Sequence, residues 1–387
     1  MPNHQPVIFV HGLFGFGPDE LGPLAYWGSA FKVPSPLPRF EASVGPISSA
    51  YDRACELAAQ IRGTQVDYGA DHAARAGHTR FGRDYTGKGF VPTWSASNPV
   101  HLVGHSLGAQ TIRCLQQMLA SDTWGWGSDA RWVASISTIS GVLNGSTLTY
   151  FFGVDEQSGR LKPENGIVPI ALMLELFTTA TGRFLEVLYD FDLQHWGFSR
   201  RADETLVEYL SRVARSPFFW GEDNAAYSLS LQGAYSDNSV WCTSPESYYF
   251  AYITEQTSEG LISGRHYPDF RMNPALLGLS TYIGRKEFAD PPIPLADFRS
   301  ADWWENDGMV PTYSQRYPFS SGNHPAGGEF DAGTPASAFT PGQWYTSWER
   351  GMDHLDICIT PQLTQFGRQR RFYRSLLERL AALTIGG

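Results

Sequence analysis

Residues 99–120 read PVHLVGHSLGAQTIRCLQQMLA and contain two patterns joined by a glycine-flanked turn. Residues 99–104 form a short apolar run, which is typical of a buried strand, and residues 106–120 carry apolar side chains at helical spacing. The pentamer GHSLG between them fits the G-x-S-x-G pattern, in which a serine occupies a strained strand-to-helix turn and small neighbours prevent steric collision. The N-terminus of the following helix favours developing negative charge. This stretch therefore predicts that Ser106 is a nucleophile.

The segments around this unit alternate apolar runs with helical patterns, and this order favours an α/β fold. We expect an α/β-hydrolase core with a mostly parallel central sheet, formed by residues 1–387 as a single domain. The last helix has one apolar stripe, and we expect it to pack at an edge of the sheet. The expected strands are 7–10, 99–104 and 132–140, and the expected helices are 49–62, 106–120 and 366–383.

The composition limits the partners of the chain. The formal net charge is −10, only 18% of the residues are charged, and no run of lysine and arginine is present. This excludes a nucleic-acid partner and gives no attraction to an anionic membrane surface. No window approaches 18 uninterrupted apolar residues, and MPNHQP leads directly into the strand-like VIFV, so we expect neither a transmembrane span nor a signal peptide. The four cysteines lack CxxC spacing and are expected to be small buried hydrophobes.

The segment VHGLFGFG follows the first expected strand directly. In an α/β-hydrolase this position presents a backbone N–H group to the negative oxygen of the tetrahedral intermediate. We therefore expect the oxyanion donors to be the N–H groups of Leu13 and Leu107. The alternative is an ordinary turn between a strand and a loop.

A serine nucleophile needs a base, and the α/β-hydrolase order places the acid and then the histidine after the serine. Beyond residue 260 three histidines remain, at 266, 324 and 354. His324 lies in the flexible-looking SSGNHPAGG, whereas His354 lies in GMDHLDICI just before an apolar run. His354 is therefore the better candidate for the base.

The candidate acid is Asp307 in WWENDGMVPT, because the glycine that follows it permits the sharp turn that a catalytic carboxylate needs. Asp302 and Asp290 are the alternatives. In this interpretation Ser106 attacks an ester carbonyl, His354 takes and later returns the proton, and Asp307 fixes the imidazole tautomer.

Two of the ten histidines lie close together in GADHAARAGHTRFGR, residues 69–83. His72 and His78 are either solvated surface residues or half of a metal site, because neutral imidazole is a common zinc ligand and carboxylates complement it. The segment alone does not decide between these interpretations.

Motifs along nearly the whole chain resemble those of the zinc-containing secreted lipases of bacilli and staphylococci. This resemblance implies one zinc ion in a small extra domain, held by two aspartates and two histidines. By motif position these ligands are Asp52, His72, His78 and Asp223. Such a site has four protein ligands and no open position, so the zinc would be structural. The matching segments are VHGLFGFG, AYWGS, VGPISSAYDRACELAAQIRGTQVDYGADHAARAGHTRFGR, GHSLGAQT, LYDFDLQHWG, NDGMVPT and MDHLD.

The same resemblance implies two insertions into the core. Residues 46–90 and 205–250 would form the zinc-binding subdomain, and residues 141–204 would form a lid or cap region. Parts of 165–190 and 203–214 would be lid helices whose apolar face covers the serine in water. A lipid surface would stabilise the open lid by burying that face again.

This sequence departs from the family in two features, the calcium site and the secretion signal. The family binds calcium beside the catalytic histidine through a carboxylate, Asp356 here, and through a second acid shortly after it. HLDICITPQ lacks the second acid, and Arg271 replaces a glycine that supplies a carbonyl ligand, so we do not expect calcium. The relatives are secreted, which implies an extracellular enzyme, although this chain shows no secretion signal.

Together these features predict a serine carboxylester hydrolase, and specifically a triacylglycerol lipase acting on an ester or lipid substrate at a lipid–water interface. The alternative is a short-chain carboxylesterase or polyester hydrolase with an open site, because the chemistry requires only an accessible ester. An acyltransferase could use the same triad. A zinc-stabilised binding protein without activity would not need the set Ser106, Asp307 and His354.

Overall fold

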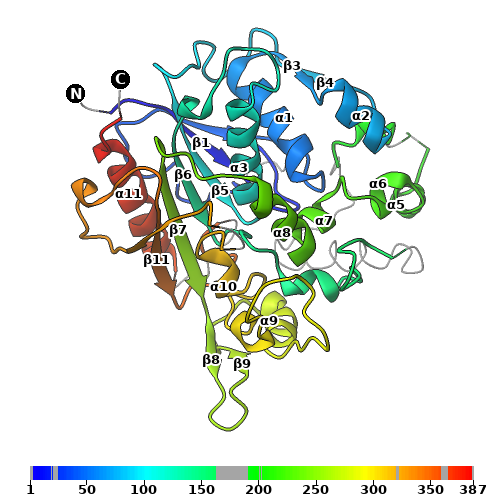
Figure 1. Ribbon diagram of the computed structural model, residues 1–387, viewed down its shortest axis with the longest axis vertical. Coiled ribbons are helices and arrows are strands. Elements are labelled where there is room, and N and C mark those ends of the chain that lie inside the picture. Colours follow the sequence, from blue (N-terminus) through cyan, green and yellow to red (C-terminus); the bar gives the residue numbers. More distant parts are fainter. Residues whose placement is uncertain are drawn as a thin grey trace.

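The core is a seven-stranded sheet in which every neighbouring pair of strands is parallel, in the order β10-β11-β7-β6-β5-β1-β2 (Figure 1). The computed structural model describes residues 3–18, 20, 25–162, 191–199, 201, 203–319, 322–358 and 365–385. The predicted α/β architecture with a parallel central sheet is confirmed. The strands of this sheet are β1 Val7–Val10, β2 Arg39–Ala42, β5 Val100–His105, β6 Val133–Ile139, β7 Tyr248–Glu255, β10 Ala326–Glu329 and β11 Trp344–Arg350. The helices are α1 Ala50–Arg62, α2 Ala70–Ala76, α3 Leu107–Ala120, α5 Leu206–Ala214, α6 Pro217–Trp220, α7 Ala225–Leu229, α8 Leu231–Val240, α9 Leu277–Ile283, α10 Thr312–Gln315 and α11 Phe366–Ala382.

The central strands are buried on both faces, since every residue of β1, β5 and β6 is buried, and this explains why β1 is a continuous apolar run, VIFV, rather than an alternating pattern. Helices α1 and α3 pack together over one face, where Ile8 and Leu102 belong to the same buried cluster. Helix α11 covers the opposite face, as the contacts of Tyr373 with Phe9 and of Phe372 with Tyr252 show. The expectation that this helix packs at a sheet edge was therefore wrong. Its apolar stripe buries more surface against a whole face than an edge could offer.

The sheet register brings the candidate residues to one edge. Val10 pairs with Gly104, and His105 pairs with Ile139, so β1, β5 and β6 end at the same level. Because parallel strands end at a common edge, the loop after β1 and the turn after β5 meet there. Strand β7 ends at the same edge, and Glu255 at its end forms a bridge with Met352, two residues before His354.

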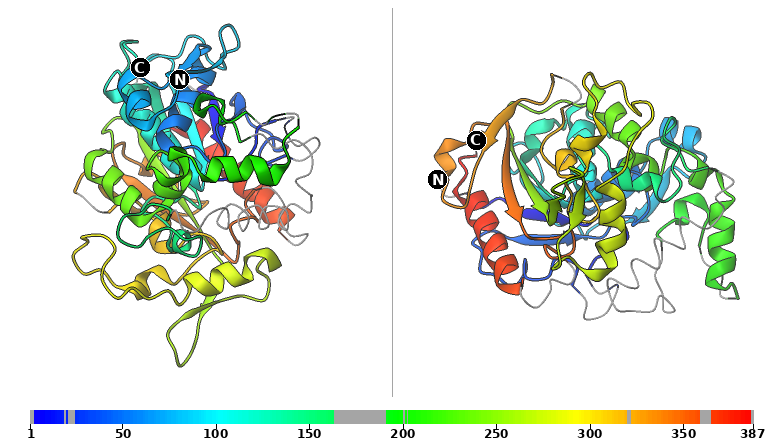
Figure 2. Two further views of the ribbon diagram at one scale, coloured as in Figure 1. Left: turned by 90° about the vertical axis from the view of Figure 1, so that its right-hand side faces the viewer. Right: turned by 90° about the horizontal axis from the view of Figure 1, so that it is seen from below.

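The chain between the core strands forms excursions beside the sheet (Figure 2). Strands β3 Gln65–Asp67 and β4 Phe81–Asp84 form an antiparallel pair around α2. Helix α5 begins with a capping box between Thr205 and Glu208, and it buries Tyr209 in the core cluster. Of the expected lid helices, 203–214 corresponds to this element, whereas residues 163–190 lie outside the described part of the chain.

A second antiparallel pair, β8 Thr257–Glu259 and β9 His266–Pro268, continues beyond the end of β7 and projects from the body of the molecule (Figure 1). Among the described residues, no helix combines the length and the apolar character needed to cross a membrane. Cys55, Cys114 and Cys358 are buried as expected, whereas Cys242 is exposed in the loop after α8.

Candidate active site and metal centre

Ser106 occupies the turn between β5 and α3 with φ 56° and ψ −122°, a conformation that a side chain rarely adopts. The turn is possible because glycines stand two residues before and two residues after the serine. A Cβ atom at Gly108 would lie 2.2 Å from the carbonyl oxygen of Val10, so only glycine allows α3 to approach β1 this closely. The sequence predicts this strand–turn–helix unit, and the strain it stores is typical of functional positions.

Asp307 and His354 form a buried pair in which Asp307 Oδ2 lies 2.8 Å from His354 Nδ1. The carboxylate is fixed from both sides. The backbone N–H groups of Met309 and Val310 donate to Oδ1 at 3.0 and 2.8 Å. The Oδ2 atom accepts from Thr254 Oγ1 at 2.7 Å and from Gln315 Nε2 at 3.2 Å. Thr254 and Gln315 carry no motif signal and were not predicted.

In the described structure no hydrogen bond joins Ser106 Oγ to the ring of His354, and such contacts are often long before a substrate binds. The two loops are connected through His105, whose Nε2 lies 3.2 Å from the carbonyl oxygen of His354. Its Nδ1 lies 2.7 Å from Tyr26 Oη, which accepts the N–H of Gly12 at 2.8 Å. A carbonyl oxygen can only accept, so Nε2 of the neutral His105 ring carries the proton and donates to His354, and Nδ1 accepts from the Tyr26 hydroxyl. Burial, followed by the charge of His354, holds the pKa of His105 well below its usual range.

The backbone N–H groups of Leu13 and Leu107, the expected oxyanion donors, donate to no acceptor in the described part of the chain. Leu107 begins α3, where the first N–H groups of a helix have no partner within the helix. The loop that carries Leu13 touches the serine turn, because a Cβ at Gly12 would lie 2.7 Å from the Cβ of Ser106. Both donors are therefore free and close to the candidate nucleophile.

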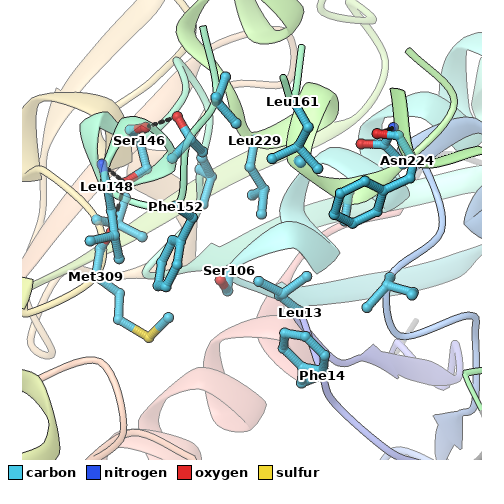
Figure 3. Close-up of a pocket in the computed structure, with 18 of the residues that line it drawn as sticks. Leu13, Phe14, Ser106, Ser146, Leu148, Phe152, Leu161, Asn224, Leu229 and Met309 are labelled. Atoms are coloured by element: carbon cyan, nitrogen blue, oxygen red, sulfur yellow. Dashed lines mark hydrogen bonds between the residues drawn. The ribbon is translucent and has the colours of Figure 1, made fainter. Parts of the chain in front are cut away.

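Ser106 lies in a pocket whose walls are aliphatic and aromatic (Figure 3). The close-up shows the serine facing a space that Leu13, Phe14, Phe152 and Met309 surround. The polar residues among its lining are few, namely Ser106, Ser146, Thr149 and Asn224. Such a pocket accepts the hydrocarbon part of a substrate because it removes apolar surface from water. The lining consists of Leu13, Phe14, Ile47, Ser106, Val142, Ser146, Leu148, Thr149, Phe152, Val154, Leu161, Phe218, Phe219, Asn224, Ala225, Ala226, Leu229, Met309 and Val310.

The alternative acids and bases lie elsewhere. His324 has both ring nitrogens occupied, by Thr243 Oγ1 at 2.9 Å and by the carbonyl oxygen of Asn238 at 3.3 Å. His266 lies on β9, Asp302 pairs with Arg299, and Asp290 is exposed.

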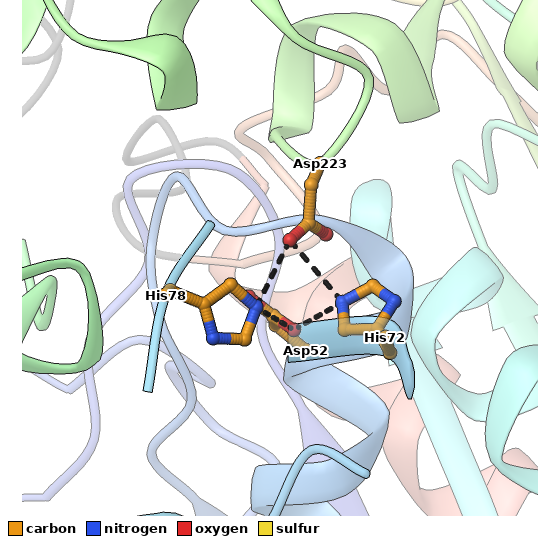
Figure 4. A group of neighbouring side chains, drawn as sticks. All are labelled: Asp52, His72, His78 and Asp223. Carbon is orange, nitrogen blue, oxygen red and sulfur yellow. Dashed lines mark hydrogen bonds and ion pairs between the residues drawn. The ribbon is translucent and has the colours of Figure 1, made fainter. Parts of the chain in front are cut away.

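Asp52, His72, His78 and Asp223 converge on one point (Figure 4). His72 Nε2 lies 3.1 Å from Asp52 Oδ1 and 3.2 Å from Asp223 Oδ2, and His78 Nε2 lies 3.7 and 3.3 Å from the same atoms. A tetrahedral ion with bonds of about 2.0–2.1 Å requires ligand atoms about 3.3 Å apart. Asp52 is buried, and the others are partly buried. The four residues predicted from different segments therefore form a group that can hold a metal ion.

The chemistry of this group also fits a cation. Burial lowers the pKa of His72, but the carboxylates of Asp223 and Asp52 outweigh it and raise this pKa to about 9. The Nε2 atom of His78 is buried without a hydrogen-bond partner, although it faces the carboxylates. Two carboxylates and two imidazole nitrogens that point at one another are the donor set of a divalent cation.

A family model described as Lipase-like, C-terminal domain, matches residues 3–382. The chain belongs to this family. It is 34% identical to Lipase 2 of Staphylococcus aureus over 343 residues, which represent 82% of this chain and 45% of that protein. The chain thus spans less than half the length of this relative. The resemblance expected from the sequence is confirmed.

Two solved structures of lipases and esterases share the fold of this lipase-like chain. EstA from Clostridium botulinum has a TM-score of 0.81 at 30% identity, covering 100% of this chain and 89% of that one. Lipase 1 from Pelosinus fermentans has a TM-score of 0.78 at 30% identity, covering 99% and 100%. At this similarity the core architecture is shared over the full length.

His195 is the residue of the candidate metal centre that the sequence did not reveal. Its Nε2 lies 3.0 Å from Asp52 Oδ2, the oxygen that faces away from His72 and His78. Its ring stacks on Tyr68 at 4.5 Å, and its carbonyl oxygen accepts the N–H of Thr79 at 2.9 Å. The only available signal was a third histidine in the aromatic segment LYDFDLQHWG.

Asp356 lies beside the candidate base, where its Oδ2 accepts the N–H of Asp353 at 3.2 Å. Residues 359–364, in which a second calcium-binding acid would have to lie, are outside the described part of the chain. The expectation that calcium is not bound stays a prediction.

Proposed function

We propose that this chain is a serine carboxylester hydrolase, and specifically a triacylglycerol lipase. The observation that carries the proposal is the position of Ser106, on a strained turn inside an apolar pocket and at the sheet edge that also bears the Asp307–His354 pair. Members and structural neighbours of its family are named lipases or esterases, which supports this choice.

In the proposed mechanism Ser106 Oγ attacks the ester carbonyl, and His354 Nε2 takes its proton. Asp307 holds the opposite ring nitrogen in the protonated tautomer and stabilises the positive charge that develops on the ring. The N–H groups of Leu13 and Leu107 donate to the oxygen that becomes negative. His354 then gives the proton to the departing alcohol, and water releases the acyl group from Ser106 in the reverse sequence.

The apolar lining of the pocket favours an acylglycerol substrate over a polar ester. With almost no polar lining, it offers a fatty acyl chain about 0.8 kcal/mol for each buried CH₂ group, whereas a polar substituent would lose its water without gaining a partner. A short-chain carboxylesterase or a polyester hydrolase is the alternative, because either would use the same serine with a more open entrance.

We further propose that the cluster of Asp52, His72, His78 and Asp223 binds zinc. When bound there, the ion supplies a structural tie with no open coordination position. Asp52 lies in the first turn of α1, which packs on the sheet, whereas Asp223 lies between α6 and α7. The tie would therefore join residues 46–90 to residues 205–250, the two parts of the proposed zinc subdomain.

The proposed lid comprises residues 141–204 together with the helix that ends at residue 214. By resemblance to the secreted lipases of bacilli and staphylococci, we also propose that the enzyme works outside the cell. A lid predicts that turnover rises when a triacylglycerol forms an emulsion, because the apolar face uncovered by lid opening is buried at the interface.

The deciding experiment compares the hydrolysis of a soluble short-chain ester, an emulsified long-chain triacylglycerol and a polyester film. The Ser106→Ala variant serves as the blank. A rate that increases sharply when the triacylglycerol forms an interface supports a lipase. Strong turnover of the soluble ester or film without this increase supports a short-chain carboxylesterase or a polyester hydrolase instead of a lipase. Turnover by Ser106→Ala within tenfold of wild type refutes the proposed nucleophile.

A further inference from the structure

Apolar side chains are exposed unevenly over the molecule. Five of the ten large hydrophobic side chains that are exposed in the described part of the chain lie between residues 261 and 277. Leu261 and Ile262 are fully exposed, at 105% and 102% of their reference areas, and Phe270 is 91% exposed. Each buried aliphatic side chain of this size is worth about 1.5–3 kcal/mol. The full exposure of two adjacent aliphatic side chains, Leu261 and Ile262, therefore indicates a surface that another apolar phase or molecule covers when the protein functions.

The pair occupies the tip of the β8–β9 hairpin. The turn is closed by hydrogen bonds from Gly260 N–H to the Arg265 carbonyl oxygen at 2.8 Å and from Gly264 N–H to the Gly260 carbonyl oxygen at 3.0 Å. Figures 1 and 2 show that this hairpin is the part that projects farthest below the body. A projecting, ordered tip places its side chains ahead of the rest of the surface.

The base of the hairpin packs against the wall of the substrate pocket. Met272 and Leu276, which follow β9, lie in one buried cluster with Leu148 and Phe152. Leu148 and Phe152 also line the pocket that contains Ser106. The segment that follows the hairpin is thus separated from the pocket by one layer of packed side chains. The tip and the candidate nucleophile also share the carboxyl edge of the sheet, since the hairpin continues from the end of β7.

The charge and the shape of the hairpin tip favour contact with a neutral lipid phase over contact with an anionic bilayer or a protein. Residues 257–272 contain two acidic residues, Glu259 and Asp269, and two arginines, Arg265 and Arg271. This balance, with a chain charge of −10, provides no attraction to an anionic bilayer. A narrow convex tip also offers far less than the roughly 800 Å² that each partner buries in a stable protein interface. A fluid apolar phase can instead surround a convex tip on all sides.

We propose that the β8–β9 tip, through Leu261 and Ile262, inserts into the surface of aggregated neutral acylglycerol and holds the pocket at that surface. The proposal rests on the proposed lipase function, because it assumes an insoluble substrate. It assigns to this hairpin an anchoring role that is separate from ester cleavage and from lid opening.

Binding is measured by flotation with an emulsion of long-chain triacylglycerol coated with phosphatidylcholine, and all proteins carry Ser106→Ala to prevent turnover. The tip variant is Leu261→Ser combined with Ile262→Ser. The matched control is Val240→Ser, which removes a side chain that is 72% exposed at the end of α8. We expect the tip variant to partition at least tenfold more weakly and the control to remain within twofold of the parent. Equal partitioning of all three proteins overturns the proposal.

Two further measurements separate this inference from its alternatives. A dimer that forms with increasing protein concentration and that the tip variant abolishes would identify the tip as a protein interface and overturn the proposal. Binding that requires anionic lipid in the coat would overturn the neutral-surface assignment. With Ser106 restored, the tip variant should hydrolyse a soluble short-chain ester within twofold of wild type. A wild type without ester turnover would refute the proposed function, whereas flotation of the Ser106→Ala proteins would still test the tip.

Discussion

The hydroxyl of Tyr26 lies 2.7 Å from Nδ1 of His105 and accepts the N–H of Gly12 at 2.8 Å. One buried side chain thus connects the loop after β1 to the serine turn after β5. His105 extends the connection to the backbone of His354. The loop that carries a proposed oxyanion donor, the turn that carries Ser106 and the loop that carries the proposed base are therefore positioned together.

Tyr26→Phe should destabilise the fold by about 1–3 kcal/mol, because it leaves a buried N–H group and a buried ring nitrogen without a partner. Turnover of a soluble ester should also fall, since the two loops lose their connection. The measurements are urea unfolding and kcat. Tyr248→Phe is the control, because it removes one partly buried bond to the Thr384 carbonyl oxygen. Equal effects of the two substitutions would contradict the positioning role.

Gly12→Ala should lower activity on a soluble ester and the melting temperature, because the new Cβ would lie 2.7 Å from the Cβ of Ser106. Overpacking of this kind costs about 1–3 kcal/mol. Gly278→Ala is the matched control, since a Cβ there meets nothing within 4 Å. Wild-type kinetics and stability for Gly12→Ala would show that the loop can shift without consequence.

Asp307→Asn should reduce kcat by a factor on the order of 10³–10⁴, because the amide cannot hold the same tautomer of His354. Asp302→Asn serves as the comparison, since Asp302 pairs with Arg299 at the surface. Steady-state kinetics on a soluble ester distinguishes the two. A larger loss for Asp302→Asn would transfer the role of acid to that residue.

His72→Ala and Asp223→Ala should reduce zinc content and melting temperature first, because loss of a structural metal acts through folding stability. Zinc is measured by elemental analysis after dialysis, and stability by thermal unfolding. His4→Ala, at an exposed position, is the control. Loss of activity with zinc content and stability both intact would contradict a structural site.

His195→Phe should weaken zinc binding by about 10–100-fold, the range found when the partner of a metal ligand is removed. The expected cause is that Asp52 Oδ2 loses its bond to His195 Nε2, and competition with a chelator measures the change. Wild-type affinity in this variant would show that Asp52 is oriented without His195.

The sequence by itself determined the parallel core and the strained serine turn. Local spacing was sufficient there, because an apolar run, a G-x-S-x-G turn and a helical pattern follow one another within residues 99–120. The sequence also indicated the four residues of the candidate metal cluster, but only because motifs along the whole chain resemble those of the secreted lipases of bacilli and staphylococci. No local rule relates Asp52 to Asp223.

Only the tertiary structure decided which side chains support these residues and which surfaces stay exposed. Thr254, Gln315 and His195 contribute through single hydrogen bonds between distant segments, and such bonds leave no periodic or motif signal. Helix α11 lies on a sheet face rather than an edge because its apolar stripe buries more surface there, and the stripe alone does not show which surface will be available to it. The exposed pair at 261–262 carries no sequence motif, and only the fold places it at a projecting tip.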